Sequence, residues 1–116
     1  MKSRPIAYLS AIVYMAVILV MSVMPAQGPQ IENLDKLEHF AAYAIMGGLW
    51  IWALEARSAG KLNIIMSAVV ISAVFGALVE VCQSFTQTRT ASFLDALANG
   101  FGAIAGSYVF ARIRLK

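Results

Sequence analysis

Charge and cysteine are scarce in this chain, and each scarcity excludes a class of protein. Only 13% of the 116 residues are charged and 60% are hydrophobic, whereas about 25% of the residues of an ordinary soluble domain are charged. The mean hydropathy of +0.75 predicts that a bilayer covers the apolar surface. The single cysteine, Cys82, excludes an internal disulfide and any metal motif built on cysteine pairs, and its apolar neighbours favour a packing role.

A concentrated basic patch is also missing. The net charge is +3, but the basic residues stand in short clusters at the ends of the apolar runs. That distribution suits lipid headgroups and the charge bias of membrane insertion, so we expect no nucleic-acid partner.

Long uncharged runs are what the chain has instead. Residues 5–24 form one such run after Lys2 and Arg4, and as a helix it is about 30 Å long, the thickness of a bilayer core. A cleaved signal peptide is the alternative, but its apolar region is usually only roughly 7–15 residues long. Met24 is also a poor cleavage-site residue, so we expect a retained transmembrane helix that ends at Pro25.

Three further apolar runs follow, separated by short polar connections. They predict helices over 35–54, 62–82 and 92–111, so the fold class is an all-α, polytopic membrane protein with four transmembrane helices in one domain, 1–116. The spacings of Asp35 with Glu38 and of Ser92 with Asp95 predict capping boxes at two of the helix starts.

Small and aromatic residues indicate how these helices pack. Ala98, Gly102 and Gly106 recur every four residues and predict a stripe for close helix contact, and Gly47-Gly48 would allow the same. Trp50 and Trp52 are expected near a membrane interface, where indole rings are favoured.

The charge distribution predicts the orientation. If the side of the N-terminus is called inside, seven of the nine basic residues fall inside, and only Lys36 and Arg89 fall outside. Five of the six acidic residues fall outside, the exception being Glu55. Lys and Arg are enriched in cytoplasmic loops, so both termini are expected in the cytoplasm.

Polar side chains gather at the outer mouths of three predicted helices. Asp35, His39 and Tyr43 are spaced by four and share one helix face, and Asn99 follows Asp95 by four. Caps and topology markers explain several of these residues equally well. Glu80 is harder to explain in this way, because its neighbours are apolar and a carboxylate there needs a partner, such as Arg89 or Lys36.

These residues stand in three spaced motifs: Asp35-Lys36-x-x-His39-Phe40-x-x-Tyr43, then Gly76-x-x-x-Glu80-x-x-Gln83, then Arg89-x-x-Ser92-x-x-Asp95-x-x-x-Asn99-x-x-Gly102. Together they resemble the VanZ-like family of bacterial integral membrane proteins, over about residues 31–106. The family is named for an accessory protein of glycopeptide resistance associated with teicoplanin. The resemblance implies a place in the bacterial cell envelope, and it implies no reaction. It does not by itself make the chain a resistance protein, so a link to teicoplanin tolerance stays open.

Three functions fit this outer cluster. The first is binding of an anionic lipid or a lipid-linked envelope intermediate. The second is catalysis on a lipid phosphate. The third is a structural role as the partner of other membrane proteins or of a second copy. In the first, Lys36 and Arg89 contact phosphate, and the ligand-binding set is Lys36, Tyr43, Gln83, Arg89 and Asn99. In the second, His39 acts as general base, and the catalytic set is His39, Glu80 and Asp95.

Whether the chain is an enzyme stays open at this point. We expect no metal or other cofactor, although His39, Glu80 and Asp95 are a weak candidate ligand set for a divalent ion. The expected location is the bacterial inner membrane, with the cluster on the extracytoplasmic side.

Overall fold

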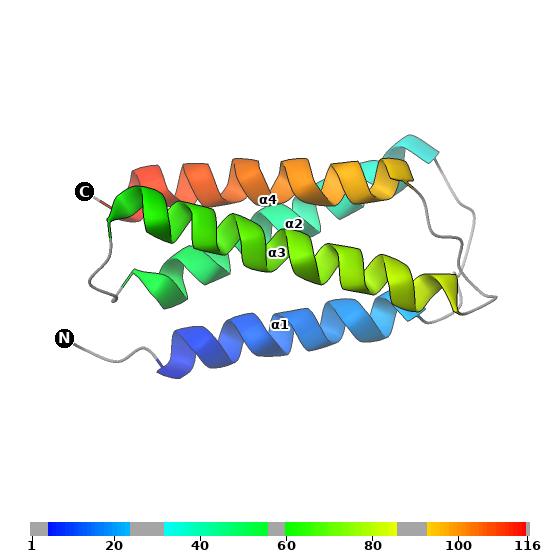
Figure 1. Ribbon diagram of the computed structural model, residues 1–116, viewed down its shortest axis with the longest axis horizontal. Helices are drawn as coiled ribbons and strands as arrows, with labels where there is room; N and C mark the ends of the chain where they lie inside the picture. The colour runs from blue at the N-terminus through cyan, green and yellow to red at the C-terminus, as the bar shows by residue number, and fades with distance from the viewer. Residues whose placement is uncertain (1–4, 24–31, 56–59, 86–92, 116) are drawn as a thin grey trace.

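Four antiparallel helices form the protein in the computed structural model, which describes residues 5–23, 32–55, 60–85 and 93–115, without the side chains of 32–36 and 93–95. The helices are α1 (Pro5–Val23), α2 (Glu32–Leu54), α3 (Lys61–Ser84) and α4 (Phe93–Arg114). The all-helical prediction is confirmed over these ranges (Figure 1).

The ends of the helices agree with the sequence prediction to within two residues, except at the end of α4, which lies three residues later than predicted, and at the start of α2. That helix begins at Glu32, three residues before the expected start, so Asp35 lies inside the helix and its predicted capping-box position is wrong. Helix α4 begins at Phe93, which agrees with Ser92 as the preceding cap residue, although Ser92 itself lies outside the described residues. Helix α3 ends at Ser84, and the Phe85 N–H donates to the carbonyls of Cys82 and Gln83.

The bundle has two ends, which we name here. At the terminal end α1 begins and α4 ends, and at the distal end α1 and α3 end while α2 and α4 begin (Figure 1). The molecule measures 46 × 24 × 21 Å, and 46 Å is close to the full thickness of a bilayer with its headgroups, about 40–45 Å. At the terminal end Glu55 accepts two hydrogen bonds of 2.7 Å from the Arg114 guanidinium.

The closest helix contact is a glycine seam between α2 and α4. A Cβ added at Gly102 would collide with the carbonyl of Phe40, and one added at Gly106 would collide with the carbonyl of Ala44. Gly47 of α2 lies in the same way against Ser107. The predicted packing roles of Gly102, Gly106 and Gly47 are therefore confirmed, since no larger residue would fit at this separation.

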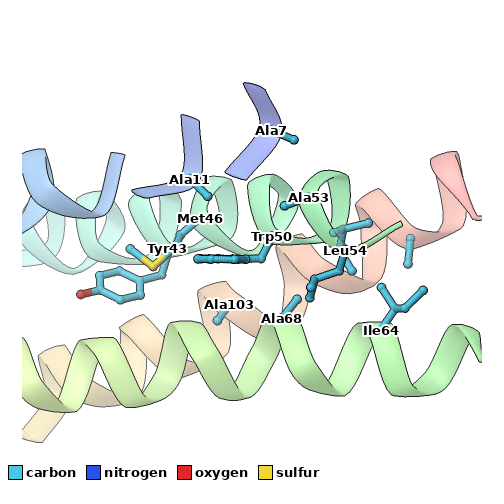
Figure 2. Close-up of a cluster of buried hydrophobic side chains, with 12 residues drawn as sticks. Ala7, Ala11, Tyr43, Met46, Trp50, Ala53, Leu54, Ile64, Ala68 and Ala103 are labelled. Carbon is cyan, nitrogen blue, oxygen red and sulfur yellow. The ribbon is translucent and has the colours of Figure 1, made fainter. Parts of the chain in front are cut away.

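Figure 2 shows the apolar core, to which α2 contributes the largest side chains, among them Tyr43, Met46 and Trp50. The Trp50 indole N–H donates to the Met15 sulfur at 3.3 Å, and the ring packs edge-on against Tyr8 with centroids 6.0 Å apart. Trp50 is only 8% exposed. The indole therefore finds its partner inside the bundle, and the depth of Trp50 and Trp52 near a membrane interface stays a prediction.

The outer surface of the bundle is apolar. Helix α3 exposes a line of large side chains spaced by four: Leu62, Met66, Val70, Val74 and Leu78. Three segments, Pro5–Val23, Leu37–Leu54 and Lys61–Ser84, are long and apolar enough to cross a membrane. Exposed apolar surface on this scale is the surface of a membrane protein.

Candidate functional site

The candidate site lies toward the distal end, where α2, α3 and α4 bring four polar side chains around Gly76. We call this the distal cluster and define it as His39 and Tyr43 of α2, Glu80 of α3 and Asn99 of α4. The residues are separated by up to 60 positions in the chain, and the antiparallel packing of the helices brings them together. This juxtaposition agrees with the prediction that the helix mouths converge.

His39 and Asn99 form the direct contact between α2 and α4. The His39 Nδ1 lies 2.9 Å from the Asn99 Oδ1, and Asn99 is only 3% exposed. The contact is a hydrogen bond between the imidazole and the amide, and which of the two donates depends on the histidine tautomer and on the orientation of the amide. Asn99, which the sequence assigns to ligand binding, therefore orients the histidine.

Tyr43 lies one turn further along the same face of α2 and is 2% exposed. Its ring lies against Gly76, where an added Cβ would come within 3.1 Å of Cε2. The hydroxyl has no hydrogen-bond partner among the described residues, and it points away from Met46 in Figure 2. A buried hydroxyl in this state is costly unless an ordered water or a ligand satisfies it, and Ser72 and Ser107 are in the same state.

Glu80 stands one turn beyond Gly76 on α3 and interacts electrostatically with Tyr43. It is half-buried, as expected for a carboxylate that does not face lipid. The cluster thus combines an imidazole, a phenol, a carboxylate and an amide, which together can donate hydrogen bonds, accept them and hold a proton.

Gln83 belongs to a different contact. It is 3% exposed, and its Nε2 donates to the Ser22 carbonyl at 2.9 Å, in the last turn of α1. A terminal helix carbonyl has no partner within its own helix, and Gln83 supplies one. The residue thereby ties α3 to α1, and its predicted ligand contact stays a prediction.

For three of the predicted site residues, the structure describes no side chain. Arg89 lies outside the described residues, as do the side chains of Lys36 and Asp95. Among the described residues, no three His, Cys, Asp or Glu side chains lie close enough to share a metal ion. The set of His39, Glu80 and Asp95 includes an undescribed side chain, so that set stays a prediction.

Sequence reasoning missed several buried hydroxyls and misjudged Cys82. Ser72 and Ser107 are fully buried without a hydrogen-bond partner in the described part of the bundle, and the Tyr14 hydroxyl donates to the Ala42 carbonyl at 2.8 Å. A usable signal was present, because Ser72 precedes Gly76 by four and so shares its face. Cys82 is exposed, which makes its expected packing role wrong.

The comparison with known families agrees with this architecture. The family model for VanZ/LLP1 matches residues 6–114, which include all four helices and the whole distal cluster. The chain belongs to the VanZ/LLP1 family. No curated protein and no solved structure was found to match it. As a VanZ/LLP1 protein with three helices fit to cross a bilayer, it is a membrane protein whose distal cluster lies within the matched range.

Proposed function

We propose that this VanZ/LLP1 protein crosses the bacterial cytoplasmic membrane four times and keeps both termini in the cytoplasm. Helix α4 supports this, since it has 22 residues and packs along α2, the most extensive helix contact in the bundle. Seven of the nine basic residues belong to the terminal end and its flanking segments, which is the cytoplasmic bias of Lys and Arg. The distal cluster then faces the extracytoplasmic side.

Cysteine accessibility tests this orientation. In a Cys82→Ala background, Thr88→Cys should react with an impermeant maleimide in intact cells, and Ser58→Cys should react only after the cells are opened. Labelling of Ser58→Cys but not Thr88→Cys in intact cells would reverse the proposed orientation.

At its extracytoplasmic face the protein binds the phosphate headgroup of an anionic lipid or a lipid-linked envelope intermediate. The observation that carries this proposal is the buried Tyr43 hydroxyl without a partner among the described residues, beside a histidine held by Asn99. A hydroxyl donor satisfies a phosphate oxygen, and the lipid chains would lie on the apolar helix surfaces. Lys36 and Arg89, near the same ends in sequence, would neutralise the phosphate charge.

Phosphorus NMR of the purified protein in detergent tests the binding directly. Polyprenyl phosphate, polyprenyl diphosphate and common phospholipids are added in turn, with wild type and Glu80→Gln run side by side. Shifted or broadened lipid resonances without new peaks are the expected result. The absence of any change for every lipid would contradict lipid recognition and favour a structural partner role.

Catalysis on a lipid phosphate is the second candidate, and the His39–Asn99 contact is the observation that favours it. An imidazole that an amide holds at Nδ1 is positioned to act as a general base through Nε2. New phosphorus peaks that wild type produces and His39→Gln does not would identify the bond broken and replace the binding proposal.

A link to teicoplanin tolerance follows from the proposal only if the ligand is an envelope intermediate. A comparison of the teicoplanin sensitivity of cells with and without the gene tests that link. An unchanged sensitivity leaves lipid binding in place and removes the resistance role.

A further inference from the structure

The last turn of α4 carries two arginines that make different contacts. Arg114 shares its charge with Glu55 through two hydrogen bonds of 2.7 Å. Arg112 is exposed, and among the described residues no acidic side chain pairs with it. Its Nη1 donates instead to the Tyr108 hydroxyl at 3.3 Å, and the guanidinium lies over the Tyr108 ring, 5.9 Å from the centroid. The helix dipole favours a cation here, but it does not account for an arginine that rests on a tyrosine ring without an acidic partner in the described chain.

Arg112 also ends an exposed face of α4. The residues of this face are spaced by three or four positions: Phe101, Ile104, Tyr108 and Arg112. Along the helix axis, Tyr108 lies about 6 Å from Arg112 and Ile104 about 12 Å from it. The face therefore changes from hydrocarbon to a phenol and then to a guanidinium. That order matches the depth profile of one bilayer leaflet, in which hydrocarbon gives way to an interface that favours tyrosine and then to charged headgroups.

A phospholipid lying along this face would meet complementary groups at each depth. Its acyl chains would lie on Phe101 and Ile104. Its phosphate would accept hydrogen bonds from the N–H groups of Arg112 that the Tyr108 contact does not use. Since Arg112 has no acidic partner among the described residues, a lipid with a net negative charge suits it better than a zwitterionic lipid, which brings its own cation.

We propose that Arg112 is the centre of a binding site for an anionic phospholipid at the terminal end of the bundle. The contact with the lipid is assigned to Arg112, and Tyr108 supports the guanidinium through its ring. The site lies at the opposite end from the distal cluster and uses none of its residues. The inference rests on the proposed crossing of the membrane by α4 and is independent of the ligand proposed for the distal cluster.

A local reporter measures the lipid preference at this face alone. In a Cys82→Ala background, Ile104→Cys is labelled with the fluorophore bimane, and the full-length protein is reconstituted into vesicles of dioleoyl phosphatidylcholine. Brominated phosphatidylglycerol or brominated phosphatidylcholine is added at the same mole fraction, and bromine quenches only a fluorophore that it approaches closely. The relative binding constant should favour phosphatidylglycerol about fivefold, the contribution of one basic side chain near an anionic headgroup.

Two variants that each remove one positive charge separate a local site from the basic character of the whole terminal end. Arg112→Gln should abolish most of the preference. Lys61→Gln removes the same charge at the same end, but from α3, and should leave most of the preference in place. Both side chains are exposed, so neither change should disturb the fold, and unchanged quenching by brominated phosphatidylcholine checks this. Equal losses in the two variants would assign the preference to diffuse charge and would overturn the proposal.

The failure of this inference is distinguishable from the failure of the proposed function. Equal quenching of wild type by the two brominated lipids would overturn the anionic site and leave the crossing by α4 and the ligand of the distal cluster as proposed. Absence of quenching by either lipid would show that Ile104 does not face hydrocarbon. That result would overturn the proposed crossing by α4, and this inference with it.

Discussion

Tyr43 shows how a single residue can act against the stability of the fold that contains it. Its ring is a large part of the core, but its hydroxyl is buried without a partner among the described residues. In water such a group is hydrated, and in an apolar interior an unpaired hydroxyl costs about 1–3 kcal/mol. The folded protein bears this cost while the hydroxyl is unpaired, and a hydrogen bond to a ligand or an ordered water offsets it.

Replacing Tyr43 by Phe should therefore separate stability from binding. We expect Tyr43→Phe to raise the free energy of unfolding in detergent by up to about 1 kcal/mol, because an unsatisfied hydroxyl disappears. Binding of a lipid phosphate should fall about tenfold. Denaturant titration and lipid titration measure the two effects. Tyr108→Phe, which alters an exposed ring, is the control and should change neither. A large loss of stability would mean that the hydroxyl is partnered in the folded protein.

At the scale of the helices, α4 and α1 are attached in contrasting ways. Helix α4 lies backbone to backbone on α2 through the glycine seam, where contact depends on the absence of side chains. Helix α1 buries only Ala7 and Ala11, and it is linked to its neighbours by hydrogen bonds that include the Tyr14–Ala42 and Gln83–Ser22 contacts. We infer a rigid α2–α4 pair with α1 bound more weakly.

Two glycines of α4 test the seam. Gly106→Ala would place a methyl group against the Ala44 carbonyl, and overpacking of this kind should destabilise the fold by about 2 kcal/mol or more. Gly100→Ala is the matched control, because nothing lies within 4 Å of its added Cβ. That change should stabilise the helix by about 0.5–1 kcal/mol. Denaturant titration in detergent measures both, and equal effects at the two sites would refute the seam.

The attachment of α1 predicts a change in dynamics rather than in fold. Gln83→Ala removes the hydrogen bond to Ser22, so the distance between spin labels on exposed Val20 and Leu78 should become more broadly distributed. Pulsed electron resonance in a Cys82→Ala background measures that distribution. Ser84→Ala is the control, since the Ser84 hydroxyl donates to the Val81 carbonyl within α3. A broadening of equal size in the control would refute the role of Gln83.

For the whole molecule, the strongest sequence signals were the uncharged runs and the spacings of four. The runs predicted the four helices closely, because a membrane span needs an uninterrupted apolar length. The spacing of Gly102 and Gly106 predicted a packing face, because small residues so placed have few other uses. The same rule placed His39 and Tyr43 on one helix face.

The pairings between helices were beyond the reach of the sequence. Nothing in the chain indicates that Asn99 meets His39 rather than a ligand, since either contact satisfies an amide. The partner of Trp50 was equally hidden, because nothing in the sequence indicates that its indole N–H meets the sulfur of Met15. Such choices depend on which helices become neighbours.

The terminal end carries a prediction for the molecule as a whole. Glu55 directly follows α2 and Arg114 ends α4, and two hydrogen bonds join them; the Arg114 side chain is 40% exposed and the Glu55 side chain 9%. Because water reaches the guanidinium, Glu55→Gln should cost no more than about 1 kcal/mol at low salt and less at about 1 M salt, where screening is strong. Glu38→Gln, which removes an exposed carboxylate at the distal half, is the control. A cost that does not depend on salt would refute the surface character of the pair.

The glycine seam also determines which substitutions the sequence of α4 can tolerate. On the seam face of α4, selection acts on volume, since even a methyl group at Gly106 is too large. On the opposite face, Phe101 and Ile104 are exposed and would meet hydrocarbon if α4 crosses the membrane, so selection there would act on polarity and be indifferent to shape. The two faces of α4 are thus under different constraints on substitution. In a saturating mutational library, the tolerated residues should alternate along α4 between a set of small residues and a broad apolar set, with the period of the helix.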